Sequence, residues 1–243
     1  MSKEIESNKK IKELPVNPFE AFLSQYCSNE WIIFLKNHLK VKSFKKGQRI
    51  ISEGDKVTGV YFINNGMVKV VSLFDKTNER ILRLANTGAL VGHRGLYSKH
   101  YQISAIALSE TEMTYIPMDI FTILIKTNPD LSIFLITFIS EELRRADEQM
   151  KNMIHGEVIT RITIIICMLI DAFGYDPKEK FKLNYTLSRK DIANIAGTTY
   201  ESVIRNLSQL ENRKLIKMDG KSFIIPNEAE LRKLTGTQVN SRQ

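Results

Sequence analysis

One short stretch, LSRKDIANIAGTTYESVIRNL, limits the fold of this chain more than any other. It carries two helix-start signals with one glycine between them. Ser188 is followed three residues later by Asp191, and Thr198 by Glu201, which is the spacing of a capping box. Gly197 ends the first helix before the second begins. Two short helices joined by such a turn predict a helix-turn-helix.

The second helix of this pair has an apolar face and a polar face. Val203, Leu207 and Leu210 recur at spacings of four and three, so they face the core. The side chains that point elsewhere are Tyr200, Glu201, Ile204, Arg205, Ser208 and Gln209. Most of them lie near the start of the helix, which is the end that a recognition helix inserts into the major groove of DNA.

A hairpin follows this helix. In KLIKMDGKSFII, Asp219-Gly220 is predicted to be a two-residue turn between two strands. Helix, turn, helix and hairpin together predict a winged helix. The segment from Lys178 to Lys221 has ten Lys or Arg against five Asp or Glu, and the whole chain has a net charge of +8. This charge permits a polyanionic partner such as double-stranded DNA.

Glu201 and Arg205 lie four residues apart and share one helix face. Arginine bonds bidentately to O6 and N7 of guanine, and glutamate accepts from the N4 amino group of cytosine. The alternative is a solvated surface pair worth about 0.3 kcal/mol. The winged helix around the pair favours base contacts. The full set of candidate DNA-binding residues is Ser188, Arg189, Thr198, Thr199, Tyr200, Glu201, Ile204, Arg205, Ser208, Lys217 and Lys221.

The segment before residue 117 has a different pattern, in which turn residues break up short apolar runs. The predicted strands are VYFI (60–63), MVKVVSLF (67–74), ILRL (81–84), ISAIAL (103–108) and EMTYI (112–116). Asn65-Gly66 predicts a tight hairpin between the first two. Strands at this spacing predict an antiparallel barrel or roll. Helical spacing in 21–39 precedes it.

Helical periodicity returns after Pro117, with Asp119 as a candidate helix cap and Asn128-Pro129 as a break. The next helix has an apolar seam at alternating spacings of three and four. The seam residues are Ile136, Ile139, Leu143, Ala146, Met150 and Met153. Charged side chains, Glu142 among them, occupy the opposite face. This seam predicts dimerisation, with packing inside its own domain as the alternative.

The chain thus has an α+β organisation with two domains. The predicted parts are a lead (1–20), a β-roll sensor domain (21–127), a dimerisation helix with a hinge (128–156) and a winged-helix domain (157–243). No apolar signal region or membrane-length run appears, which favours a cytoplasmic protein without a membrane partner. No phosphate-binding loop, metal-ligand pair of histidines or nucleophile motif appears either. The sequence therefore predicts no enzyme, metal or cofactor.

The segment LSRKDIANIAGTTYESVIRNLSQLENRKLI resembles the helix-turn-helix signature of the cyclic-AMP receptor / fumarate–nitrate regulator (Crp/Fnr) superfamily. FKKGQRIISEGDKVTGVYFINNGMVKVV resembles the cyclic-nucleotide-binding-type β-roll of that superfamily. The resemblance implies a homodimeric transcription factor on a near-palindromic operator, with RNA polymerase as a further partner if it activates. It also implies that Glu201 and Arg205 read bases.

By the same resemblance, VGHRGLYSKHYQISAIAL holds the effector pocket. The candidate residues are Gly92, His93, Arg94, Gly95, Leu96, Ile103 and Ser104. His93 stands where cyclic-AMP binders have Glu, Ile103 where they have Arg, and Ala146-Asp147 where they have Thr-Ser. These departures predict that cyclic AMP is not bound in the familiar way, which leaves a different effector or none.

Several alternatives remain open from the sequence. His93 and Arg94 either meet another anion or are structural. Cys27 and Cys167 are too few for an iron–sulfur cluster, whereas haem ligation by one of the histidines is open. The alternative function is a nucleotide-sensing module whose winged helix docks on a protein instead of DNA.

Overall fold

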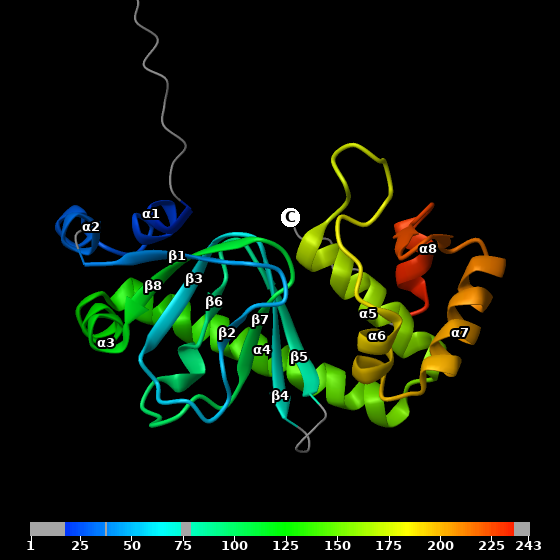
Figure 1. Cartoon of the computed structure of the whole chain (residues 1–243), viewed down its shortest axis with the longest axis horizontal. Coiled ribbons are helices and arrows are strands. Elements are labelled where there is room, and N and C mark those ends of the chain that lie inside the picture. The colour runs from blue at the N-terminus through cyan, green and yellow to red at the C-terminus, as the bar shows by residue number, and fades with distance from the viewer. Residues whose placement is uncertain (1–17, 37, 74–78, 236–243) are drawn as a thin grey trace, which may run out of the picture.

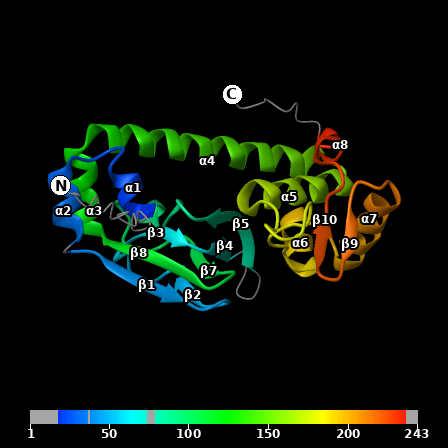
Figure 2. The same ribbon diagram turned by 90° about the horizontal axis from the view of Figure 1, so that it is seen from above.

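The computed structural model describes residues 18–36, 38–73 and 79–235. They form an N-terminal β-roll and a C-terminal winged-helix domain, and one long helix lies along both (Figures 1 and 2). Most of the predicted lead, the end of the predicted strand 67–74 and residues 236–243 lie outside the described residues.

The β-roll consists of two four-stranded antiparallel sheets. One has the order β1 (Lys40–Phe44), β8 (Thr111–Pro117), β3 (Gly59–Asn65), β6 (Leu90–Val91). The other has the order β2 (Arg49–Ile51), β7 (Ser104–Ala107), β4 (Met67–Leu73), β5 (Glu79–Asn86). The predicted roll and its five predicted strands are confirmed. Strands β1, β2 and β6 are additional, and β1 pairs along its whole length with β8.

The expected hairpin at Asn65-Gly66 is wrong. β3 and β4 belong to different sheets, so this pair of residues is a corner at which the chain crosses between them. Gly66 has φ +116°, and a Cβ there would lie 2.7 Å from the Cα of Thr111. The glycine is needed for a positive φ and for this close approach of two backbones.

Four helices pack on the roll: α1 (Pro18–Leu23), α2 (Asn29–Lys36), α3 (Met118–Thr127) and α4 (Pro129–His155). The predicted cap at Asp119 is wrong, because Pro117 is the N-cap of α3 and Asp119 lies in its first turn. The break at Asn128-Pro129 is confirmed, with the proline opening α4. Within the described residues no single helix is long and apolar enough to cross a membrane; α3 and α4 together pass by length and composition but bend by 108°.

The winged-helix domain contains α5 (Val158–Phe173), α6 (Arg189–Ala196), α7 (Tyr200–Asn212), β9 (Lys217–Asp219), β10 (Ser222–Ile224) and α8 (Glu228–Lys233). The predicted turn is shifted by one residue. Asp219 pairs with Ser222 across the hairpin, so the two turn residues are Gly220 and Lys221. Gly220 supplies the positive φ of +57° that such a turn needs.

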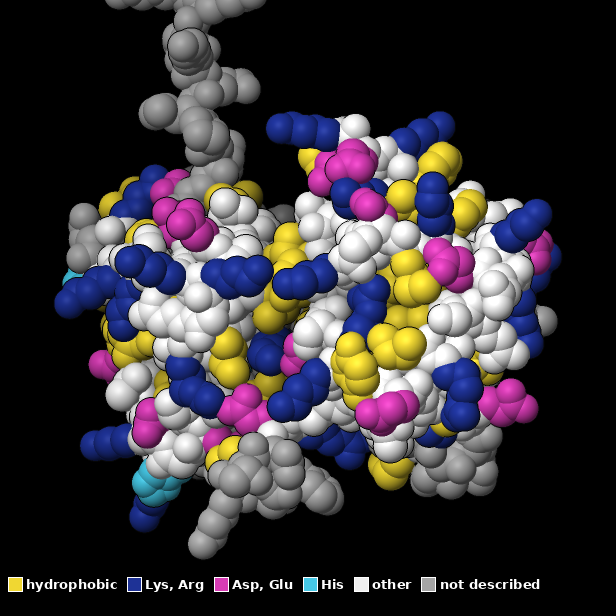
Figure 3. Space-filling view, turned by 45° about the vertical axis from the view of Figure 1, so that its right-hand side comes forward, with side chains coloured by type: hydrophobic (Ala, Val, Ile, Leu, Met, Phe, Trp, Pro, Cys, Tyr) yellow, Lys and Arg dark blue, Asp and Glu magenta, His cyan; other side chains and the backbone are white. Residues whose placement is uncertain are grey.

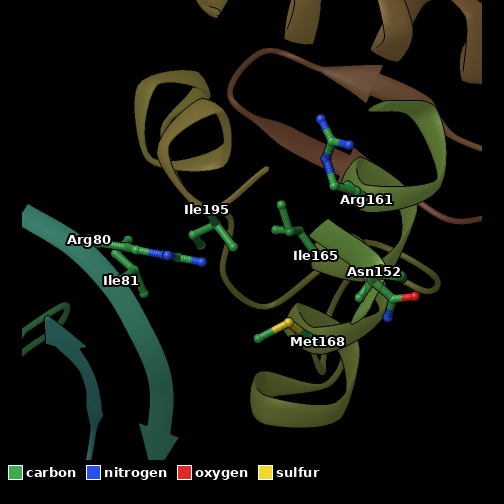
Figure 4. Close-up of a pocket in the computed structure, with 8 residues that line it drawn as sticks. Arg80, Ile81, Asn152, Arg161, Ile165, Met168 and Ile195 are labelled. Atoms are coloured by element: carbon green, nitrogen blue, oxygen red, sulfur yellow. The ribbon is translucent and has the colours of Figure 1, made fainter. Parts of the chain in front are cut away.

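The two domains pack on each other through β4, β5 and the first two helices of the winged-helix domain. Val71 and Ile81 of the roll join a buried cluster with Ile165 and Ile166 of α5. The Lys69 ammonium of β4 also lies 3.1 Å from an Asp191 carboxylate oxygen of α6. A small cavity of about 30 Å³ remains at this junction. Figure 4 shows its lining, in which Arg80 and Ile81 face Ile165, Met168 and Ile195.

That cavity is far below the roughly 300–1,000 Å³ of a typical small-molecule site. It has room for little more than a water molecule. The junction is therefore a packed interface between the domains.

Candidate DNA interface and sensor site

The joint between α6 and α7 sets the direction of the second helix. Ser188 caps α6 as predicted, and its hydroxyl accepts from the amide of Asp191 at 3.0 Å. Gly197 closes α6 in a left-handed conformation, with φ 59° and ψ 47°. The amide of Thr198 then donates back to the carbonyl of Ala193 at 3.0 Å. Thr198 thus completes the end of α6.

For this reason the predicted cap of α7 is one residue too early. Thr199 is the N-cap, and its hydroxyl accepts from the amide of Ser202 at 3.2 Å. Two adjacent threonines therefore have different roles: Thr198 ends one helix and Thr199 starts the next. The turn between α6 and α7 is short because the residue that completes α6 is directly followed by the residue that caps α7.

The two faces of α7 are as predicted. Val203, Leu207 and Leu210 are fully buried in the domain core. Glu201 and Arg205 are exposed, and no ion pair joins them among the described residues. Tyr200 and Ile204 are also exposed, at 52% and 40%, which places two apolar side chains beside the two charged ones. Figure 3 shows this side of the molecule, with hydrophobic and charged side chains intermixed over the winged-helix domain.

The remaining predicted DNA contacts lie on both sides of α7. Arg189 in the first turn of α6 donates from Nη1 to the carbonyl oxygen of Lys221 at 3.0 Å, and its guanidinium lies over the ring of Phe223. Arg189 therefore attaches the wing to α6. Burial lowers the pKa of Arg189 below its ordinary value. Lys217 and Lys221 are exposed on the wing, whereas Ser208 is half-buried.

The predicted effector segment folds as a short 3-10 helix, η1 (His93–Gly95), after β6. Gly92 and Gly95 leave little room for a side chain there: a Cβ on Gly92 would lie 3.3 Å from the Gly59 carbonyl oxygen, and one on Gly95 would lie 2.9 Å from the side chain of Val57. Gly92 also needs its positive φ of +89°. Leu96 follows at the end of η1 and is half-buried.

The other two predicted pocket residues are in the interior of the roll. Ile103 is 4% exposed and belongs to the apolar core of the sheets. Ser104 is buried, and its hydroxyl accepts from the amide of Glu53 at 2.9 Å. Neither residue directs a charge into the segment around His93.

Two residues that contact the predicted effector segment or its partner, Glu142 and Arg83, were missed by the sequence analysis. Glu142 was placed on the charged outer face of α4, but its side chain is only 9% exposed. Its Oε2 lies 3.0 Å from His93 Nε2 and 3.4 Å from Arg94 Nη2. Arg83 of β5 reaches the other oxygen, with Nη1 2.6 Å from Oε1, a charge contact without hydrogen-bond geometry. No signal in the sequence links β5 to α4 across this distance along the chain.

The apolar seam of α4 faces outward in the single chain. Ile136, Ile139, Leu143 and Met150 have exposed fractions of 66%, 49%, 63% and 57%. Ala146 is exposed as well, and the side chain of Met153 lies outside the described residues. The buried face of the same helix carries Leu131 and Leu135.

Comparison with known proteins agrees with this architecture. Residues 41–128 match the family model of the cyclic nucleotide-binding domain, and residues 160–234 match that of the Crp-like helix-turn-helix domain. The chain belongs to the Crp/Fnr superfamily. It is accordingly a DNA-binding transcription regulator of the CRP/FNR type, and its relatives are regulators, not enzymes.

Three relatives illustrate the similarity of this Crp/Fnr protein. It is 28% identical to the fumarate and nitrate reduction regulatory protein of Vibrio cholerae, over 83% of this chain and 80% of that one. It is 27% identical to the electron transport regulator A of Shewanella oneidensis, over 80% of this chain and 78% of that one. The cAMP-activated global transcriptional regulator CRP of Salmonella typhimurium is also 27% identical, over 81% of this chain and 92% of that one.

Solved structures show the same fold for this Crp/Fnr protein. FixK2 from Bradyrhizobium japonicum superimposes with a TM-score of 0.71 at 20% identity, covering 83% of this chain and 99% of FixK2. A CRP/FNR-family transcriptional regulator from Thermus thermophilus gives a TM-score of 0.69 at 19% identity, covering 82% of this chain and 99% of that one.

Proposed function

We propose that this regulator binds a near-palindromic DNA operator as a homodimer and that α7 of each protomer reads one half-site. The observation that carries the proposal is the exposed face of α7. Glu201 and Arg205 are both exposed there, opposite a fully buried apolar face, and they are not paired with each other. Arg205 is thus available for guanine and Glu201 for cytosine.

Tyr200 and Ile204 extend the same reading surface. Exposed apolar groups on a recognition helix contact the C5-methyl group of thymine. We infer that Ile204 makes such a contact, since it lies between Glu201 and Arg205 in the sequence and is 40% exposed. Phosphate contacts come from Ser188, Arg189 and Thr198 at the helix starts and from Lys217 or Lys221 on the wing.

The dimer is proposed to form through the seam of α4. A run of exposed Ile, Leu and Met side chains at heptad spacing matches the contact surface of a two-helix coiled coil. A second copy of α4 would bury these side chains and place two recognition helices on one face. A regulator that activates would in addition contact RNA polymerase.

The sensor domain is proposed to respond to an effector other than cyclic AMP, or to none. Ile103 is buried where cyclic-AMP binders place the phosphate-binding arginine. The two guanidinium groups that do reach this region, those of Arg83 and Arg94, already pair with Glu142. A cyclic phosphate would therefore have to compete with a carboxylate of the chain itself.

Selection from a random pool of double-stranded DNA tests the proposal. The full-length protein should enrich a near-palindromic consensus with G·C pairs in both halves. Its affinity for that consensus should fall steeply with salt, with a slope of about −0.9 per neutralised phosphate. If no sequence is enriched, the winged helix docks on a protein instead.

A further inference from the structure

The side chain of Glu142 meets three basic residues inside the sensor domain. Arg83 comes from β5, His93 and Arg94 come from η1, and the carboxylate comes from α4. Three elements, of which α4 lies far from the other two in the sequence, thus converge on two oxygen atoms. The exposed fractions of the side chains are 18% for Arg83, 5% for His93 and 9% for Glu142.

The charges in this cluster are unequal. Two guanidinium groups and an imidazole surround a single carboxylate, so Glu142 is the one anion among these four side chains. Burial alone would raise the pKa of Glu142, but the hydrogen bond from His93 and the charges of Arg83 and Arg94 outweigh it and lower the pKa to about 2. The carboxylate is therefore held as an anion.

The surroundings hold the basic groups in place even apart from Glu142. Arg83 Nη2 donates to the carbonyl oxygen of Leu90 at 2.7 Å, and its guanidinium lies 5.6 Å from the ring centre of Phe138. The His93 ring packs edge-on against Phe138 at 5.1 Å. In the described part of the chain, His93 Nδ1 is buried without a hydrogen-bond partner. The one polar contact of the ring there is therefore that of Nε2 with Glu142. This is a preformed receptor for a carboxylate.

We propose that Arg83, His93 and Arg94 form a carboxylate-binding site and that Glu142 of the same chain is its resident ligand. The inference rests on the proposed role of the β-roll as the sensor domain and specifies how that domain is regulated. The side chain of α4 closes the site and ties the helix to β5 and η1. Arg94 is 44% exposed and open to solvent, whereas an external anion reaches Arg83 and His93 only when it displaces Glu142.

Chemical rescue tests this assignment directly. Glu142→Ala removes a CH₂–COO⁻ group, and acetate has the same carboxylate with a methyl group. The variant should lose about 5–15 °C in Tm, because the Arg83 guanidinium loses its counter-ion and the buried His93 ring loses its hydrogen-bond partner. Sodium acetate should restore much of this loss in a saturable manner, compared with sodium chloride at equal ionic strength. The wild-type protein should show no acetate-specific shift.

Two further variants make the test specific. Glu141→Ala removes the neighbouring carboxylate, which is 44% exposed and pairs with Arg144 at 2.8 Å; it should neither lose comparable Tm nor respond to acetate. Glu142→Gln keeps the volume but removes the charge, so it should lose Tm and not respond to acetate, because the amide fills the space. If Glu142→Ala does not fold alone, its refolding yield against acetate concentration is the readout.

The proposal is overturned if Glu142→Ala keeps the wild-type Tm, or if acetate acts on it no more than on Glu141→Ala. It is likewise overturned if acetate stabilises the wild-type protein as strongly as the variant. None of these measurements includes DNA. A failure here therefore leaves the proposed base contacts of α7 untouched, and a failure to bind DNA leaves the carboxylate site untouched.

Discussion

The side chain of Asn194 in α6 makes two hydrogen bonds with the outer edge of β5. Its Nδ2 donates to the carbonyl oxygen of Glu79 at 2.7 Å, and its Oδ1 accepts from the amide of Ile81 at 3.3 Å. The first helix of the helix-turn-helix is thereby bonded to the backbone of the sensor domain. The edge of β5 is covered by this contact instead of being left unpaired.

Asn194→Ala should loosen the contact between the domains. It leaves one carbonyl and one amide of β5 without these partners, which should cost about 1–3 kcal/mol of stability. Hydrogen exchange of the Ile81 amide should become faster, as measured by NMR or mass spectrometry. Lys190→Ala on the same helix is the control, since Lys190 is exposed, and unchanged exchange in Asn194→Ala would contradict the prediction.

Acid should weaken the Glu142 cluster in a defined pH window. The pKa of Glu142 is about 2 in the folded protein and 4.5 ordinarily, so its stabilising effect is complete above pH 4.5 and is lost as the pH falls towards 2. The difference in free energy of unfolding between wild type and Glu142→Gln should be constant above that window. Within the window it should shrink by about 1.4 kcal/mol per pH unit at its steepest.

Chemical denaturation of both proteins at a series of pH values measures this difference. The basic groups that face Glu142, namely Arg83, His93 and Arg94, are present in both proteins, and so is Arg145 near Arg83. Glu141→Gln is the control and should show no comparable window. A difference that is independent of pH down to 2 would contradict the prediction.

Leu143→Glu should convert the proposed dimer to monomers. Leu143 is 63% exposed in the single chain, and a carboxylate at a central seam position would be buried without a partner in a two-helix contact. Sedimentation velocity would measure the change. Glu141 belongs to the same helix but not to the seam, so the Glu141→Lys variant should stay dimeric. If the Leu143→Glu variant stays dimeric too, the seam is not the interface.

Arg205→Ala should affect recognition at one base pair. On the selected operator it should cost about 1–3 kcal/mol per half-site and flatten discrimination at that position. Lys221→Ala on the wing should weaken binding to all sequences alike and lower the salt slope by about one. Binding to a panel of single-base operator variants at two salt concentrations separates these effects. If Arg205→Ala weakens all sequences equally, Arg205 contacts phosphate.

Cyclic AMP should bind weakly or not at all. Ile103 offers no charge to its phosphate, and Glu142 already occupies the basic groups near η1. Isothermal titration calorimetry of the full-length protein would measure this. A micromolar Kd for cyclic AMP would contradict the prediction.

Local signals in the sequence were sufficient for most of the fold. Neighbouring residues decide three features of it: the end of α6 at Gly197, the start of α4 at Pro129, and the buried face of α7 with Val203, Leu207 and Leu210. The cap of α7 was misplaced because Thr198 and Thr199 are the same residue type. Which of them caps depends on the hydrogen bond from Thr198 back to Ala193, a feature of the preceding helix.

Long-range relations could not be predicted in the same way. Asn65-Gly66 has the composition of a hairpin turn, but β3 pairs with β8 and β6, and β4 pairs with β5 and β7. Similarly, Glu142 looks like one more charge on a polar helix face. Its burial depends on Arg83 and His93, which come from other elements of the tertiary structure.

The pairing of β1 with β8 has a consequence for the synthesis of the protein. Lys40–Phe44 leaves the ribosome roughly 70 residues before its partner Thr111–Tyr115, which at about 5–20 residues per second is a delay of about 4–14 s. During this time the first sheet lacks its second strand, and the edge of β3 that pairs with β8 has no partner strand. A nascent chain that stalls before residue 111 thus exposes the interior of the sensor domain and is a natural substrate for chaperones.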